Sequence, residues 1–261
     1  MTGVERIAEA FASRVGKAAL MPYLMACFPD EDTSIAIGEA CVEAGADLLE
    51  LGIPYSDPLA DGPVIHEAAT AALNNGATVE GAFRVARSLS PQIPVVVMCY
   101  ANLVLSMGWT EFAAALADAG VCGLICPDLP LEEAPDALAA LDALGLALVP
   151  LVAPTTPDSR LKEIGSRARG FLYTVSVAGT TGEREGLAPG VDAVVARAKL
   201  ATTVPVAVGF GISTPEQALG TAAAGADGVI IGSRLVREAE EAADPAAAVG
   251  AAVRQFAAGL R

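Results

Sequence analysis

Residues 43–49 read EAGADLL, and closely similar stretches return at residues 118–125 (DAGVCGLI) and 224–231 (AGADGVII). In each, a segment rich in small residues reaches a glycine, and a run of apolar residues follows. Glycine in this place is typical of the left-handed residue that ends a helix. A weaker copy lies at residues 143–149 (ALGLALV). Helix, glycine and buried strand therefore recur at least four times, which predicts successive β–α units and a parallel sheet.

Around these repeats, the hydrophobic pattern predicts eight strands that alternate with helices. The strands are expected near residues 20–27, 47–53, 95–100, 123–127, 146–151, 171–176, 204–209 and 228–231. The helices are expected near residues 33–44, 67–74, 79–89, 110–119, 132–144, 157–165, 191–200, 215–224 and 245–258.

The length of 261 residues suits one closed barrel of this kind, which typically needs about 250 residues. We therefore predict an α/β fold, a single (β/α)8 TIM barrel with an extra N-terminal helix, with residues 1–261 as one domain. An open doubly wound sheet is the competing fold. It is disfavoured because no Gly-x-Gly-x-x-Gly turn follows the first strand.

Composition and charge exclude several classes of partner. Sixteen basic and 31 acidic residues give a net charge of −15, which repels nucleic acid and anionic lipid at long range. No apolar run approaches the roughly 18 residues that a membrane-spanning helix requires. Residues 1–17 mix charged and apolar residues and lack the apolar core of a signal peptide. We therefore expect a cytoplasmic protein that binds neither nucleic acid nor membrane.

The cysteines are an odd number scattered through apolar segments, as reduced core thiols are. They are Cys27, Cys41, Cys99, Cys122 and Cys126. The spacing of the last two suits metal ligands, but they fall in a predicted strand, no second cysteine pair exists, and the only histidine is His66. We predict no metal site.

Glu50 is the most unusual residue, because it places an ionisable group inside the apolar strand at residues 47–53. Alternation along a strand puts Leu48, Glu50 and Gly52 on one face, so Glu50 is predicted to point into the barrel mouth. Loss of water there would raise its pKa towards that of a general acid or base. Pairing with an arginine or lysine is the alternative interpretation, and the pattern does not decide between them.

The loop that follows, residues 54–63 (PYSDPLADGP), contributes two more carboxylates, Asp57 and Asp61. Asp61 stands just before a predicted helix, so a helix N-cap is its alternative role. Asp57 precedes a proline and is explained equally well by a turn. One buried carboxylate and one loop carboxylate can together protonate a substrate and stabilise positive charge on it, which suits a metal-free carbon–carbon cleavage.

Two glycine-bearing loops at the other end of the chain predict a phosphate site. Residues 208–215 (VGFGISTP) follow the seventh strand, and residues 231–234 (IGSR) follow the eighth. Barrels commonly bind phosphate at these two loops through backbone amides and a helix N-terminus. A third loop, within residues 173–186, resembles a lid, with Thr181 and Gly182 as candidate ligand contacts. A simple surface loop is the alternative there.

Residues 49–62 (LELGIPYSDPLADG) resemble the signature of the tryptophan synthase alpha chain family. Supporting similarities lie, in family order, at residues 127–130 (PDLP), 176–182 (SVAGTTG), 209–213 (GFGIS) and 232–233 (GS). The resemblance implies a lyase that cleaves indole-3-glycerol phosphate into indole and glyceraldehyde 3-phosphate.

The resemblance also implies a role for each site residue. Glu50 would be the acid/base at C3 of the indole ring, and Asp61 would contact the ring nitrogen. Tyr173 would position Glu50 and substrate, while Tyr23 and Tyr100 would line the indole pocket. The implied phosphate ligands are Gly182, Gly211, Gly232 and Ser233.

For partners, the resemblance implies a beta subunit that carries pyridoxal phosphate, in an α2β2 complex, with no cofactor in this chain. Contact is expected around residues 56–59 and 129–131. Many members have arginine where this chain has Val177, which puts the docking of the lid in doubt.

Three other functions are weighed against this one. A free-standing indole-3-glycerol phosphate lyase would need no partner, and a non-catalytic phosphate-binding protein would only activate a beta subunit. A sugar-phosphate isomerase is the third, but it normally needs a catalytic histidine or a metal, and His66 falls at a helix start.

Overall fold

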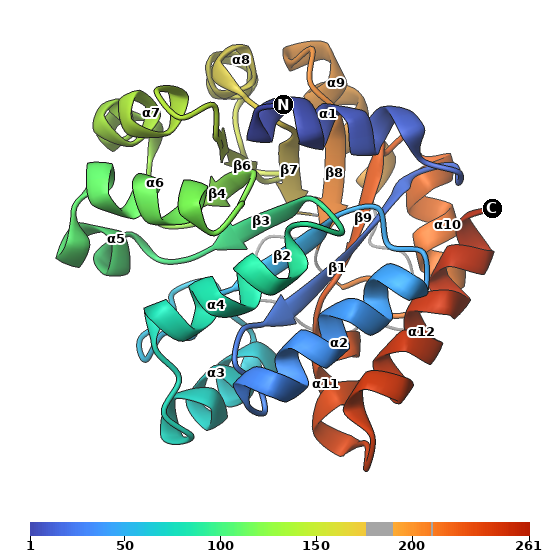
Figure 1. Ribbon diagram of the computed structural model, residues 1–261. Coiled ribbons are helices and arrows are strands. Elements are labelled where there is room, and N and C mark those ends of the chain that lie inside the picture. Colours follow the sequence, from blue (N-terminus) through green and yellow to red (C-terminus); the bar gives the residue numbers. More distant parts are fainter. Residues whose placement is uncertain (176–189, 210) are drawn as a thin grey trace.

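Nine short parallel strand segments form one sheet that curves into a barrel within the described part of the chain (Figure 1). The structure is a computed structural model and describes residues 1–175, 190–209 and 211–261. The segments are β1 (Ala19–Met25), β2 (Leu49–Gly52), β3 (Val95–Met98), β4 (Gly123–Ile125), β5 (Ala147–Val149), β6 (Leu151–Val152), β7 (Leu172–Val175), β8 (Val206–Gly209) and β9 (Gly228–Ile231). Their order is β5-β4-β3-β2-β1-β9-β8-β7-β6. The predicted parallel α/β barrel is confirmed.

The barrel closes through one predicted strand that the structure divides at Pro150. β5 pairs with β4, and β6 pairs with β7, so the two ends of the sheet order are successive pieces of the same stretch of chain. Pro150 has no N–H to give to a ladder, but its carbonyl accepts from Tyr173 N at 3.0 Å. The eight expected strands therefore appear as nine segments, because the fifth strand changes partner along its length.

Helices surround the barrel (Figure 1). They are α1 (Gly3–Ser13), α2 (Glu31–Glu43), α3 (Pro63–Asn74), α4 (Val79–Leu89), α5 (Ala101–Met107), α6 (Trp109–Asp118), α7 (Pro135–Asp142), α8 (Asp158–Arg167), α9 (Val191–Ala201), α10 (Pro215–Ala223), α11 (Ser233–Glu241) and α12 (Pro245–Leu260), with the short 3-10 helix η1 (Leu131–Glu133). None of the helices in the described ranges is long and apolar enough to cross a membrane.

The glycines of the repeated motif all adopt the left-handed conformation predicted for them. Gly45, Gly120, Gly145 and Gly225 have φ values of 94°, 72°, 68° and 100°. Each follows a helix and precedes a strand, so the chain reverses its direction there without a steric cost from a side chain. The helix-glycine-strand interpretation of the repeats is therefore correct.

Two helices were not predicted, and one predicted helix is interrupted. α5 has seven residues, which is too short for a clear apolar period. α11 has nine residues with a clear apolar face, formed by Leu235, Val236 and Ala239, and it was missed although this signal was present. The helix expected at residues 132–144 is instead η1 followed by α7, because Pro135 takes the first position of α7 and Ala134 lies between the two. Proline fits the first turn of a helix but not its interior.

α1 lies across the N-terminal ends of the strands, as the predicted extra helix. Val4 N donates to Gly145 O at 3.1 Å, just before β5. The Arg6 guanidinium donates to Gly120 O at 3.0 Å and to Ile93 O at 3.2 Å, in the segments before β4 and β3. α1 therefore closes the barrel end opposite the strand ends from which active sites are built.

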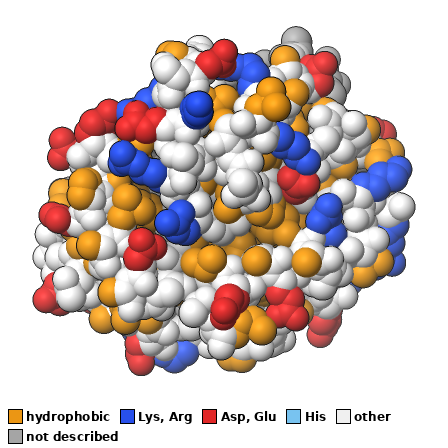
Figure 2. Space-filling model, turned by 90° about the horizontal axis from the view of Figure 1, so that it is seen from above, with side chains coloured by type: hydrophobic (Ala, Val, Ile, Leu, Met, Phe, Trp, Pro, Cys, Tyr) orange, Lys and Arg blue, Asp and Glu red, His pale blue; other side chains and the backbone are white. Residues whose placement is uncertain are grey.

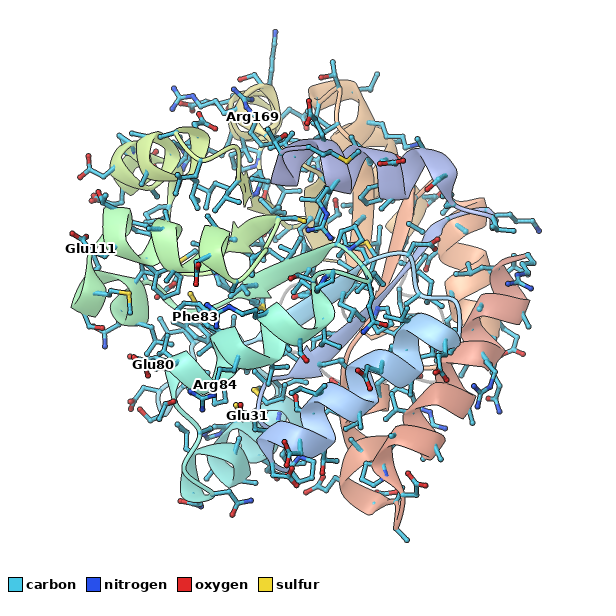
Figure 3. The ribbon with its side chains drawn as sticks, viewed as in Figure 1. Glu31, Glu80, Phe83, Arg84, Glu111 and Arg169 are labelled. Carbon is cyan, nitrogen blue, oxygen red and sulfur yellow. The ribbon has the colours of Figure 1, made fainter. Side chains whose placement is uncertain are left out.

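The outer helices are joined by polar and aromatic contacts (Figure 3). Arg84 of α4 makes a bidentate ion pair with Glu31 of α2, at 2.7 and 2.6 Å, and the rings of Phe83 and Phe112 meet edge to face at 5.4 Å. On the face shown in Figure 2, basic side chains are dispersed among acidic ones and form no single patch.

We predict that Gly165→Ala destabilises the protein although alanine is the better helix former. Gly165 is buried in α8, and a Cβ there would lie 2.3 Å from the carbonyl oxygen of Ala201, in α9. Helix propensity favours alanine by about 1 kcal/mol, whereas forcing an atom into a packed contact costs about 1–3 kcal/mol. Urea unfolding should show a net loss of about 1 kcal/mol.

The control is Ser166→Ala at the next, exposed position of the same helix, where stability should stay within about 0.5 kcal/mol. A Gly165→Ala protein as stable as the parent would contradict the close α8–α9 contact.

Candidate active site

Glu50 lies on β2 with its side chain in the barrel interior. It stands beside Tyr23 of β1 and Val96 of β3 in the sheet register, and it is only 1% exposed. Burial raises the pKa of the Tyr173 phenol, and the charge of Glu50 raises it further. Tyr173 belongs to β7, which three strands separate from β2, so the two side chains interact across the interior of the barrel.

The Glu50 carboxyl is uncompensated by any described residue. Both of its oxygens are buried, and neither has a hydrogen-bond partner in the described part of the chain. Burial, and to a smaller extent the nearby charge of Asp61, raise its pKa from 4.5 to about 8. Among the described residues, no arginine or lysine pairs with Glu50, which leaves the alternative interpretation without support there. A carboxyl group of this kind holds its proton at neutral pH and can donate it.

Asp61 is held by Tyr100, and it does not cap the following helix. The Tyr100 hydroxyl donates to Asp61 Oδ1 at 2.9 Å and accepts from Ala60 N at 3.1 Å. Burial raises the pKa of Asp61, while the bond from Tyr100 and the neighbouring His66 lower it. The N-cap position of α3 belongs to Gly62, so the alternative role for Asp61 is wrong. His66 itself is exposed on α3.

Two buried tyrosines occupy space that glycines leave open at strand ends. A Cβ on Gly52 would lie 2.1 Å from the Tyr23 hydroxyl, and a Cβ on Gly209 would lie 2.3 Å from the Tyr173 hydroxyl. Any larger residue at either glycine would displace a phenol. Glu50 and Asp61 both raise the pKa of Tyr23, after burial as the main cause. The structure thus brings the predicted residues Tyr23, Tyr173, Glu50 and Asp61 into one electrostatically connected group.

The two predicted phosphate loops lie side by side. Val208 of β8 pairs with Val229 of β9, so the segments that follow leave the barrel together. Gly211, with φ 80°, follows the first strand, and Gly232 forms the N-cap of α11 after the second. A Cβ on Gly232 would lie 3.6 Å from Cβ of Tyr23, which places this loop next to the tyrosine that adjoins Glu50.

The start of α11 suits an anion better than the start of α10. In α10, Thr214 and Gln217 form a capping box, and Gln217 Oε1 also accepts from Ser213 N at 2.7 Å. At Gly232 no side chain caps α11, whose first residue is Ser233. Uncapped amides at a helix N-terminus attract phosphate. The other predicted contacts, Thr181 and Gly182, and the lid position Val177 lie outside the described residues.

Sequence reasoning gave no role to two residues that support the Tyr100 side chain. The Tyr55 ring stacks on Tyr100 at 5.3 Å, and Asn102 Nδ2 donates to the Tyr55 hydroxyl at 3.1 Å. Asn102 lies on α5, which was not predicted, so its proximity to the loop after β2 was hidden. The available signal was the aromatic residue within the proline-rich loop at residues 54–63.

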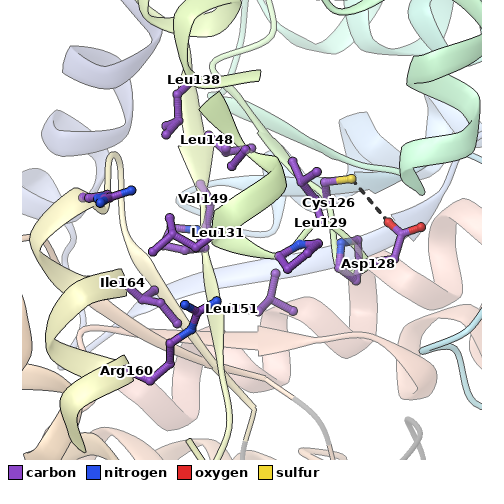
Figure 4. A pocket seen from close by; sticks show the side chains of 15 residues that line it. Cys126, Asp128, Leu129, Leu131, Leu138, Leu148, Val149, Leu151, Arg160 and Ile164 are labelled. Carbon is purple, nitrogen blue, oxygen red and sulfur yellow. Dashed lines mark hydrogen bonds between the residues drawn. The ribbon is translucent and has the colours of Figure 1, made fainter. Parts of the chain in front are cut away.

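A separate cavity of about 430 Å3 lies beside the ends of β4, β5 and β6 (Figure 4). Its lining is mostly apolar and includes Leu131, Leu148 and Ile164, with Arg160 at its edge. Arg160 forms a bidentate ion pair with Glu132. None of the predicted catalytic or tyrosine residues lines this cavity. The described residues hold no cluster of three or more His, Cys, Asp or Glu side chains suited to a metal ion.

The chain is similar to known proteins over nearly its whole length. The family model described as "Tryptophan synthase alpha chain" matches residues 10–260. The chain belongs to the tryptophan synthase alpha chain family. The tryptophan synthase alpha chain of Prochlorococcus marinus (strain MIT 9313) is 48% identical over 230 residues, which cover 87% of this chain and 84% of that one. The resemblance inferred from residues 49–62 is therefore confirmed, and the isomerase alternative is wrong.

Solved structures of the family share the fold. A structure of Mycobacterium tuberculosis tryptophan synthase has a TM-score of 0.91 and 39% identity, and the match covers 98% of each chain. A structure from Pyrococcus furiosus, described as showing the structural basis of mutual activation of the tryptophan synthase α2β2 complex, has a TM-score of 0.86 and 36% identity. That match covers 92% of this chain and 98% of the other.

We predict that Glu50 makes the free energy of unfolding fall as the pH rises. Its pKa is about 8 in the folded chain and near 4.5 when unfolded. The unfolded chain therefore loses this proton first, so the stabilisation is complete below pH 4.5 and is lost as the pH rises towards 8. The expected slope is on the order of 1.4 kcal/mol per pH unit in that window.

Urea unfolding of the parent and of Glu50→Gln at pH 5.5 and pH 8 measures this slope, because glutamine keeps the shape without ionising. The variant should gain stability over the parent at the higher pH, and the exposed substitution Glu67→Gln on α3 should not. Equal pH dependence in the parent and Glu50→Gln would show that the folded protein does not hold this proton.

Proposed function

We propose that this chain is a lyase that cleaves indole-3-glycerol phosphate into indole and D-glyceraldehyde 3-phosphate, as the alpha subunit of tryptophan synthase in tryptophan biosynthesis. The observation that carries the proposal is the pair formed by Glu50, within β2, and Asp61, in the loop that follows β2. One is a buried acid that keeps its proton near neutral pH, and the other is a loop carboxylate held by Tyr100.

In the proposed reaction, Glu50 gives its proton to C3 of the indole ring, which becomes an indolenine. Asp61 contacts the ring nitrogen and stabilises the positive charge that develops there. The Glu50 carboxylate then accepts the proton of the side-chain hydroxyl next to the ring. The bond between C3 of the ring and the carbon that carries this hydroxyl then breaks. Its electron pair stays with the ring, which becomes indole, and glyceraldehyde 3-phosphate leaves as the aldehyde. A pKa of about 8 lets Glu50 serve as acid and then as base.

The remaining site residues are proposed to orient the substrate between these carboxyls and the phosphate loops. Tyr173 positions Glu50 and the substrate, and Tyr23 and Tyr100 line the indole pocket. Gly211, Gly232 and Ser233 bind the phosphate, with Thr181 and Gly182 as further contacts. The uncapped start of α11 and its proximity to Tyr23 support this orientation.

The proposed partner is a beta subunit, in an α2β2 complex like that of the Pyrococcus furiosus relative. We place the contact on the loops after β2 and β4, at residues 56–59 and 129–131. Leu59 in the first loop is 78% exposed and Leu105 on the neighbouring α5 is 63% exposed, which favours a protein partner there. Pyridoxal phosphate is expected in the partner and no cofactor in this chain. We propose a cytoplasmic location, which the five buried, unpaired cysteines favour.

The deciding experiment is indole release from indole-3-glycerol phosphate by the purified chain, alone and with added beta subunit. Slow release that rises strongly with the partner is expected. Fast release by the chain alone would support a free-standing lyase. Absence of release under both conditions, with stimulation of the beta subunit retained, would support a phosphate-binding activator without catalysis.

We predict that Glu50→Gln and Asp61→Asn each lower indole release by about 100-fold or more, the range typical for loss of a general acid or base. Both variants should still bind glycerol phosphate, because that group is proposed to be held by the loops after β8 and β9. Binding is measured by calorimetry. Glu67→Gln, an exposed carboxylate change on α3, should keep full activity. Turnover retained in both site variants would exclude the mechanism.

A further inference from the structure

Asp128 joins the loop after β4 to the first turn of α5. Its Oδ1 atom accepts from the backbone N of Ala101 at 2.9 Å and from Cys126 Sγ at 3.4 Å. Figure 4 shows the second of these contacts. The N-cap residue of α5 is Tyr100, whose own side chain makes no capping bond to the helix. Asp128 therefore supplies, from the loop after β4, the cap that α5 lacks.

This helix start carries the phenol that holds Asp61. Tyr100 directly precedes Ala101, and its hydroxyl donates to Asp61 Oδ1 at 2.9 Å. α5 has only seven residues, so it cannot fix its own position by helix formation alone. Contacts from outside the helix hold this turn, among them the backbone anchor from Asp128 and the Tyr55 ring stacked on Tyr100.

We propose that Asp128 is a positioning residue for the lyase reaction: by anchoring Ala101 it sets the Tyr100 hydroxyl against Asp61. This rests on the function proposed above. Asp128 does not take part in the chemistry itself. Its effect passes through a backbone amide and a phenol to the carboxylate, and misplacement of a catalytic group by about 1 Å costs on the order of 100-fold in rate.

The first test measures the pKa of Asp61 by carbon NMR and needs no activity. The bond from Tyr100 lowers this pKa against the effect of burial. Tyr100→Phe should raise the pKa of Asp61, and Asp128→Ala should raise it in the same direction. Asp128→Asn keeps an acceptor oxygen for Ala101 N and should leave the pKa of Asp61 near the parent's. If Asp128→Ala does not fold, Asp128→Ser replaces it, since its shorter side chain does not place an oxygen at that distance.

The matched control is Asp244→Ala. Asp244 caps α12 in a similar way, accepting from Ala247 N at 3.0 Å, but it has no described contact with Tyr100 or Asp61. Loss of this cap should lower stability without moving the pKa of Asp61. An Asp128→Ala protein with an unchanged Asp61 pKa would overturn the proposal.

The second test is a double-mutant cycle on indole release with the beta subunit present. Asp128→Ala should lower kcat by about 10-fold or more. If it acts through Tyr100, it should have little further effect in a Tyr100→Phe background. Effects that multiply independently would mean that Asp128 only supports the fold, and would overturn the proposal. Failure of the parent to release indole would instead refute the proposed function, while the NMR result would still decide the role of Asp128.

Discussion

An apolar barrel that buries an ionisable carboxyl without a partner among the described residues is the constraint on which the site depends. Removing such a group from water costs several kcal/mol if it is charged, so Glu50 keeps its proton and its pKa rises. The cost is compatible with folding because the closed sheet surrounds the group with tightly packed apolar strands. Tyr23 and Tyr173 complete the enclosure, and both fit only because Gly52 and Gly209 have no side chains.

The two parts of the proposed site differ in the groups that they present to a ligand. On the side of β2 and β3 the site is formed by side chains: a hydrogen bond joins Tyr100 to Asp61, and the Tyr55 ring stacks on Tyr100. On the side of β8 and β9, backbone amides are offered instead. Arg234, the second residue of α11, is paired with Glu238 at 2.5 Å. For a chain of net charge −15, long-range attraction does not favour an anion, so the proposed phosphate site would depend on the local helix dipole, which acts within a turn.

Much of the fold and several residues of the candidate site could be predicted from the sequence, whereas the other features depend on contacts between residues far apart in the chain. Gly45 and Gly225 predicted helix ends because glycine alone tolerates that conformation. Glu50 was conspicuous because a charge interrupts an apolar strand, yet only the folded chain shows that nothing described compensates it. Asp61 had two equal interpretations in the sequence; in the folded chain Gly62 takes the N-cap position, and Asp61 is bonded to Tyr100, which lies 39 residues away. α5 was not predicted because it is short and because one of its anchors is the Asp128 carboxylate, in the loop after β4, which the local sequence pattern does not reveal.

The division of the fifth strand at Pro150 also makes the barrel a sheet with a seam. On one side of the seam the ladder runs from β5 back to β1, and on the other it runs from β6 to β9, and the β1–β9 pairing joins the two arcs. β6 has only two residues and a single described neighbour strand. Local opening of the barrel wall is therefore expected to begin at this seam. Tyr173, whose amide donates to Pro150 O, lies on this seam, so the seam faces the enclosed acid across the barrel interior.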